Sequence, residues 1–257
     1  MAAANPSLPR VAPPPPPRKV EWGRARAALR RLIDDPERTE QVFELIDALA
    51  GNAGERLFQR FLREPDAAGL LARKPSLLAA LSDLSALERL PGDSLGRCYA
   101  RFMREADLSA EGLVEASEEG GRERGEPLDA DRTWFYERLR DMHDLWHVVT
   151  GYGRDVAGEA ALLAFTYAQT RNRGIGAIVL AAIAKGPKSL DLAWPRYLLR
   201  AWRRGHRAVL LAAAAWEDLL ALPLEEARRR LGVAPPEVAH PGGILVAEDD
   251  ALRAAAP

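Results

Sequence analysis

The sequence predicts an all-α protein. Apolar residues recur three and four positions apart along most of the chain, the spacing of a helix that buries one face. Strand signals are scarce, and residues 244–246 are the only short candidate. Hydrophobic residues make up 47% of the 257 residues and charged residues 28%, which is ordinary for one large domain with its own core. We therefore expect a single helical domain with antiparallel helix packing.

Start and stop signals divide this domain into segments. Five consecutive prolines at 13–17 cannot bury a core, so residues 1–20 are expected to form a disordered tail. The helical domain then covers 21–235, and 236–257 form a C-terminal tail. A glutamate- and glycine-rich stretch at 107–130 predicts an exposed acidic loop with a helical turn near 109–116. The expected helices lie at about 22–33, 39–49, 57–62, 76–83, 94–106, 131–150, 155 onward, 175–185, 191–220 and 224–231.

Charge and cysteine content exclude several classes of protein. The net charge is −1, from 36 basic and 37 acidic residues, which argues against a dedicated nucleic-acid binder. The single cysteine, Cys98, excludes an intramolecular disulfide and suits a reducing compartment. The N-terminus has neither a secretory signal nor a transit-peptide pattern, and the longest apolar run, 175–184, is about half the length that a bilayer needs. Any membrane contact should be peripheral.

One short motif indicates a metal site. His143, Asp144 and His147 occupy one helical turn, and eleven residues separate His147 from Glu159. With about 100° per residue, the two histidines lie about 40° apart and Asp144 falls about 60° further round. If the helices at 131–150 and 155 onward pack against each other, Glu159 can return toward the histidines. Two imidazoles and two carboxylates suit a divalent ion such as zinc, iron, cobalt or manganese.

Two other interpretations of the motif remain. His143 and His147 can be ordinary residues of an amphipathic helix, without a ligand. The pattern is also close to the His-Glu-x-x-His motif of zinc peptidases, whose glutamate is the general base. Here that position holds Asp144, which is one methylene shorter, so peptide hydrolysis is disfavoured.

The motif and several further blocks resemble one known family. His143-Asp144-x-x-His147 with Glu159 resembles the signature of the coenzyme Q (ubiquinone) biosynthesis protein four family, and the chain would be a bacterial-type member. The upstream Leu-Pro-x-x-Ser-x-Gly-Arg-x-Tyr block at 90–99 and the residues flanking the ligands match in order. In the C-terminal half the matching residues are Trp202, Gly205, Trp216, Glu217 and the Leu-Gly-Val at 231–233.

The resemblance implies an all-α fold and a function. The family binds a divalent metal, often described as zinc, through residues that correspond to His143, Asp144, His147 and Glu159. It acts on a polyprenylated hydroxy-methoxybenzoate, in which the ring C1 carboxyl is replaced by hydroxyl. That conversion is a net oxidation, so it needs an oxidant such as O2. The same four residues are then both the metal ligands and the catalytic residues of a decarboxylase, a lyase of ubiquinone biosynthesis.

The resemblance also implies partners. The family is described as a scaffold for other ubiquinone enzymes, so the alternative function is a non-catalytic prenyl-lipid-binding scaffold at the membrane. An unrelated metallohydrolase is a third hypothesis. The expected location is the cytoplasm, with peripheral contact to the inner membrane. We expect no nucleic-acid partner, and a homodimer is one option for the oligomeric state. The small-residue helices at 175–184 and 208–215 are candidates to line a prenyl groove, with plain helix packing as the alternative.

Overall fold

The computed structural model describes residues 11–34, 39–105, 128–186 and 191–236, and these are mostly helical with no β-strand. The predicted all-α class is confirmed. The short candidate strand at 244–246 and the helical turn at 109–116 lie outside the described residues. The helices are α1 (Trp22–Asp34), α2 (Thr39–Ala50), α3 (Ala53–Phe61), α4 (Ala67–Arg73), α5 (Leu77–Ser82), α6 (Leu84–Glu88), α7 (Leu95–Glu105), α9 (Ala130–Asp141), α10 (His143–Thr150), α11 (Val156–Thr170), α12 (Arg173–Lys185), α13 (Ala193–Arg207), the 3-10 turn η3 (Leu211–Ala213), α14 (Trp216–Leu219) and α15 (Leu224–Leu231).

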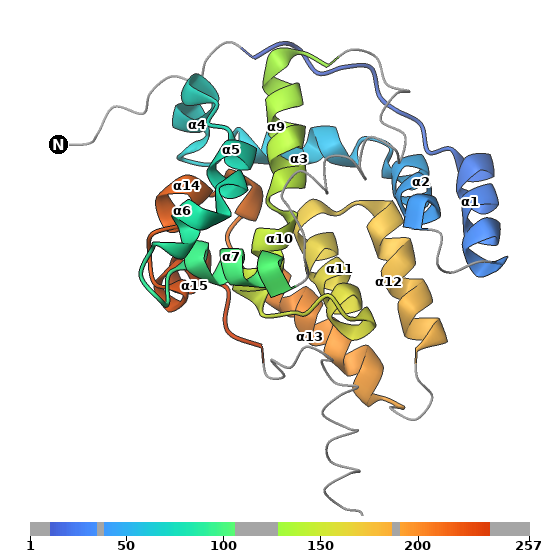
Figure 1. The fold of residues 1–257 in the computed structure, drawn as a ribbon. Coiled ribbons are helices and arrows are strands. Elements are labelled where there is room, and N and C mark those ends of the chain that lie inside the picture. Colours follow the sequence, from blue (N-terminus) through green and yellow to red (C-terminus); the bar gives the residue numbers. More distant parts are fainter. Residues whose placement is uncertain (1–10, 35–38, 106–127, 187–190, 237–257) are drawn as a thin grey trace, which may run out of the picture.

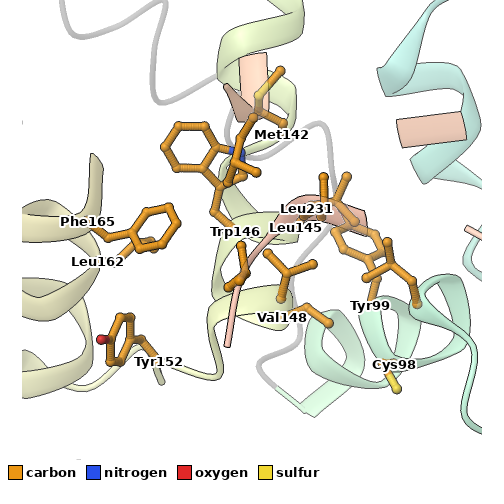
Figure 2. Packing of buried hydrophobic residues seen from close by; sticks show 14 of the residues in the cluster. Cys98, Tyr99, Met142, Leu145, Trp146, Val148, Tyr152, Leu162, Phe165 and Leu231 are labelled. Atoms are coloured by element: carbon orange, nitrogen blue, oxygen red, sulfur yellow. The ribbon is translucent and has the colours of Figure 1, made fainter. Parts of the chain in front are cut away.

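The short helix α10 lies near the centre of the molecule, where it contacts α7, α9, α11 and α15 (Figure 1). Seven of its eight residues, 144–150, are buried. A helix buried on all sides must satisfy its polar groups within the protein, because water cannot reach them. Its apolar side chains Leu145, Trp146 and Val148 join the largest core cluster, together with Tyr99 of α7 and Phe165 of α11 (Figure 2).

Two smaller cores complete the fold. One forms where α3 and α4 meet α9, around Phe58, Phe61 and Phe135. The rings of Phe58 and Phe135 meet edge to face, with centroids 5.2 Å apart. The other core joins α1 and α2 to partly buried residues of α12. The most extensive contact between two helices joins α11 and α13, which lie side by side beneath the centre of Figure 1.

The predicted long helix at 131–150 is interrupted at Met142, which ends α9 and precedes α10. The Met142 N–H bonds the carbonyl of Arg138, its ordinary helical partner, and also that of Arg140, and α9 ends there. The two halves pack into different cores: Phe135 of α9 lies against α3, whereas Trp146 of α10 lies against α11. A change of direction at Met142 allows both.

The predicted helix at 191–220 is wrong beyond Arg207. Ala208 and Leu210 are extended, and residues 211–213 form only a 3-10 turn before α14. The backbone N–H of Leu211 bonds the side-chain oxygen of Gln169 at 2.9 Å in place of a helical carbonyl. Residues 210–213 are buried, so tertiary packing overrides the high helix propensity of alanine. The helix α4 was not expected from the sequence.

The part of the Pro-rich segment that the structure describes, residues 11–20, has no regular secondary structure and is mostly exposed. Two arginines connect it to helices: Arg132 of α9 donates to the Ala12 carbonyl at 3.2 Å, and Arg18 pairs with Asp47 of α2 at 3.1 Å. The described helices run from Trp22 to Leu231, and the domain boundaries at 20 and 235 stay a prediction.

Candidate metal centre

Helix α10 carries three of the four predicted ligands on one turn. One ligand atom from each of His143, Asp144 and His147 can be chosen so that all three lie within 4.8 Å of one another. His143 Nδ1 lies 3.5 Å from Asp144 Oδ1, and the two imidazole centroids are 5.0 Å apart. This proximity follows from the i, i+4 spacing of the histidines, which places them on one face of a helix.

The fourth predicted ligand, Glu159, comes from the first turn of α11. Its Oε1 lies 3.3 Å from His147 Nε2. The start of α11 is fixed by Asp155, whose Oδ1 accepts the N–H groups of Ala157 and Gly158 at 3.1 and 3.0 Å. Gly158 lets this turn approach the preceding loop, because a Cβ there would lie 2.0 Å from the Gly153 carbonyl oxygen. The structure thus brings all four predicted residues together, while their metal binding stays a prediction.

The two imidazoles have nitrogen atoms available for a ligand. His147 Nδ1 lies 3.0 Å from the Tyr152 carbonyl oxygen. A carbonyl only accepts, so Nδ1 carries the proton of a neutral ring and Nε2 holds the lone pair. His147 Nε2 and His143 Nδ1 are both buried, and neither makes a hydrogen bond within the described ranges. Buried polar atoms without partners are costly, and a cation bound to both would satisfy them. The donor set therefore fits a divalent ion.

A partly buried arginine, Arg154, lies beside the cluster, and the sequence did not reveal its role. Arg154 Nη2 is 3.6 Å from Asp144 Oδ1, and its guanidinium carbon lies 3.6 Å from the centroid of the Phe102 ring. Its Nη1 donates to the Phe102 carbonyl at 2.7 Å. The only signal in the sequence is its position between His147 and Glu159. Arg154 adds a fixed positive charge where the carboxylates gather.

The charges in the site shift the pKa values of its groups. Burial opposes ionisation of His143, but Asp144 and Glu159 together hold the pKa of its imidazole above the ordinary value. Burial would raise the pKa of Asp144, yet His143, Arg154 and His147 hold it below the ordinary value. Burial lowers the pKa of Arg154. Asp144 is therefore an ionised carboxylate at neutral pH, the form that binds a cation.

Several other residues of the matched blocks have structural roles. Tyr99 and Trp216 are buried in the largest core, and so is Cys98, as expected for a small apolar side chain. Glu217 forms two hydrogen bonds with Arg138, at 2.5 and 2.7 Å. Residues 210–213 of the candidate groove are core, so they pack and do not line a groove.

Two further polar residues, Arg97 and His206, lie at the surface. Arg97 is exposed on α7. His206 is exposed on α13, where its ring stacks on Trp202 with centroids 5.4 Å apart. Neither belongs to the cluster of potential ligand atoms on α10. His240 lies outside the described residues.

Comparison with known proteins identifies relatives of the whole helical region. Residues 24–237 match the model of the family described as coenzyme Q (ubiquinone) biosynthesis protein Coq4. The mitochondrial ubiquinone biosynthesis protein coq4 of Aspergillus terreus is 29% identical over 181 residues, which are 70% of this chain and 60% of the relative. The corresponding protein of Yarrowia lipolytica is 30% identical over 183 residues, which are 70% of this chain and 66% of the relative. The matched region thus spans about three fifths to two thirds of these relatives' length.

A solved structure shares the fold. A crystal structure from Nostoc punctiforme, described as that of a candidate ubiquinone biosynthesis protein, aligns with a TM-score of 0.61. The alignment covers 84% of this chain and 99% of that one, at 23% sequence identity. The likeness shows that the helical arrangement occurs in an experimentally determined protein.

Proposed function

Because the chain belongs to the coenzyme Q (ubiquinone) biosynthesis protein Coq4 family, we propose that it acts in ubiquinone biosynthesis as a metal-dependent enzyme. The proposed reaction replaces the C1 carboxyl of a polyprenylated hydroxy-methoxybenzoate with a hydroxyl. The observation that carries the proposal is the convergence of His143, Asp144, His147 and Glu159, with two buried imidazole nitrogens that lack hydrogen-bond partners within the described ranges.

Each residue of the centre has a proposed role. His143, Asp144, His147 and Glu159 would hold the ion, and the Tyr152 carbonyl keeps His147 in the tautomer that presents Nε2. A bound divalent ion would supply Lewis-acid stabilisation of negative charge on a substrate oxygen. Arg154 adds a permanent positive charge 3.6 Å from Asp144, which favours approach of an anionic carboxylate. Phe102 stacks on both Arg154 and His147 and keeps this side of the centre apolar.

The electron balance constrains the metal and the co-substrate. Loss of CO2 with gain of a ring hydroxyl removes two electrons from the substrate, so an oxidant such as O2 is required. Zinc has no redox chemistry, whereas iron, cobalt and manganese fit the same nitrogen and oxygen donors. If the bound ion is zinc, the substrate must therefore transfer its electrons to O2 directly.

Turnover tests the proposal. Purified protein loaded separately with zinc, iron, cobalt or manganese is mixed with the prenylated hydroxy-methoxybenzoate under O2, and the hydroxylated product is measured by mass spectrometry. We expect product with at least one metal, and its loss in His147→Ala. His206→Ala is the matched control, because His206 is an exposed histidine outside the ligand cluster. Full turnover by the His147 variant would remove the centre from the mechanism.

The alternative proposal is a non-catalytic prenyl-lipid-binding scaffold that gathers ubiquinone enzymes at a membrane. Exposed apolar side chains favour membrane contact: Leu180 of α12 and Leu192 before α13 are 68% and 56% exposed. Arg196 and Arg203 are exposed on the neighbouring helix α13, and each arginine near an anionic surface contributes about 1 kcal/mol. In the parts of the chain that the structure describes, no helix is long and apolar enough to cross a bilayer.

Flotation with anionic liposomes tests this membrane contact. We expect the protein to float with phosphatidylserine-containing vesicles in the absence of detergent. The double variant Arg196→Glu, Arg203→Glu should no longer float. Glu substitution of Arg230, an exposed arginine of α15 that pairs with Glu226, is the control. Unchanged flotation of the double variant would discard the membrane role of α13. Sedimentation of the wild-type protein without vesicles decides between monomer and homodimer.

A further inference from the structure

The C-terminal end of the ligand helix α10 is held by two arginines from distant parts of the chain. Arg228 of α15 donates from Nε to the Val149 carbonyl at 2.8 Å and from Nη2 to the Val148 carbonyl at 3.3 Å. Arg204 of α13 donates from Nη2 to the Thr150 carbonyl at 2.8 Å. Since the Gly151 N–H bonds the His147 carbonyl, each of the last four carbonyls of α10 has a donor.

These contacts supply what the helix cannot provide for itself. The last four carbonyls of any α-helix lack intrahelical partners. In α10 they belong to residues 147–150, all of which are buried. A helix of two turns is also too short to be stable by itself. Two guanidinium groups at its C-terminal end satisfy the carbonyls and complement the negative end of the helix dipole.

The same arginines are connected to the metal ligands. Arg204 bonds the Thr150 carbonyl on one side of Gly151, and its guanidinium carbon lies 4.8 Å from the centroid of the Tyr152 ring on the other. The Tyr152 carbonyl is the group that accepts from His147 Nδ1. Arg204 therefore fixes the turn that orients His147. Arg228 fixes the last turn of α10, on which His147 itself lies.

We infer that Arg204 and Arg228 are positioning residues of the metal centre, which they reach from α13 and α15 by holding the end of α10. This inference rests on the proposed metal-binding function. A purely structural role predicts that their loss lowers stability without changing the affinity of the folded protein for metal. A positioning role predicts weaker metal binding and altered coordination in protein that remains folded.

The experiment titrates metal-free protein with Co²⁺ and follows visible absorption, whose d–d bands report coordination geometry. We expect Arg204→Ala and Arg228→Ala to weaken Co²⁺ binding by roughly 10–100-fold, as changes to groups that orient metal ligands do. The bands should change as well. Circular dichroism and thermal unfolding of the metal-free variants show whether they are folded. The matched controls, Arg203→Ala on α13 and Arg230→Ala on α15, should stay within about twofold of the wild type.

A lysine variant covers the case in which the alanine variants do not fold. In Arg228→Lys one ammonium keeps the charge but does not reproduce the two-nitrogen contact with Val148 and Val149, so binding should remain weaker than in the wild type. Wild-type affinity and bands in folded Arg204→Ala and Arg228→Ala, or in Arg228→Lys if those do not fold, would overturn the inference. Failure of the wild type to bind Co²⁺ would instead refute the proposed metal function.

Discussion

Replacement of Gly158 with alanine tests how the second ligand helix reaches the first. Gly158 lies in the first turn of α11, directly before Glu159. A Cβ at this position would be 2.0 Å from the oxygen, 2.6 Å from the carbon and 2.7 Å from the nitrogen of the Gly153 backbone. These are backbone atoms, so no side-chain rotation relieves the clash. Either the start of α11 or the loop before it must move.

The size of the movement follows from the contact distances. Ordinary van der Waals contacts of a Cβ begin near 3.4 Å, so the backbone must separate by about 1.4 Å along the shortest contact. Metal–ligand distances tolerate only about ±0.2 Å, so a shift of this size would take Glu159 out of reach of the proposed ion. Overpacking of this kind costs roughly 1–3 kcal/mol of unfolding free energy. Metal affinity should fall by at least the roughly 10–100-fold expected for disturbed ligand support.

Two measurements check this prediction: urea unfolding of the metal-free protein and Co²⁺ titration of the folded protein. Gly23→Ala is the matched control, since Gly23 is also near the start of a helix and a Cβ there would meet nothing within 4 Å. That change should leave Co²⁺ binding unaltered and be neutral or stabilising by up to about 1 kcal/mol. Wild-type affinity and stability in Gly158→Ala would refute the close approach of α11 to its preceding loop.

Three further changes test the fold that supports the centre. Burial would raise the pKa of Glu217, but Arg138 holds it below the ordinary value. The pair therefore stabilises the fold above the unfolded pKa, and that stability is lost as the pH falls through the folded pKa. Glu217→Gln should cost roughly 1.5–3 kcal/mol at pH 7 and flatten the acid limb of a stability–pH curve; an unchanged limb would contradict this. Asp155→Ala removes the cap of α11 and should cost about 1 kcal/mol in urea unfolding, whereas no loss would show that the cap is dispensable. Phe165→Ala, at a fully buried position beside Trp146, should cost roughly 3–5 kcal/mol, and a loss within experimental error would mean that this core is not well packed.

Local periodicity was enough to predict much of the fold and part of the centre. The i, i+4 spacing of His143 and His147 places them on one face of any α-helix, and the structure has them on one turn. Helices with clear apolar stripes and end signals, such as α2 before Gly51, lie close to their expected bounds. Such features depend on backbone geometry within a few residues, which the sequence specifies directly.

Packing between distant segments decided the features of the fold that local periodicity did not predict. The interruption at Met142 follows from the two different cores that α9 and α10 join, and no residue there signals a break. The extended residues after Arg207 place an alanine-rich segment in the core against its own helix propensity. In both places the favourable burial of apolar surface outweighs a local preference of less than about 1 kcal/mol per residue.

The sequence by itself determined that this protein is helical and that two imidazoles and a carboxylate share one helical turn. Only the tertiary structure placed Glu159 against His147, put Arg154 beside Asp144, and brought Arg204 and Arg228 to the end of α10. The physical reason is the distance along the sequence between the residues that interact. Neighbours within a turn are fixed by the helix geometry, whereas partners up to 80 residues apart meet only through the packing of whole elements.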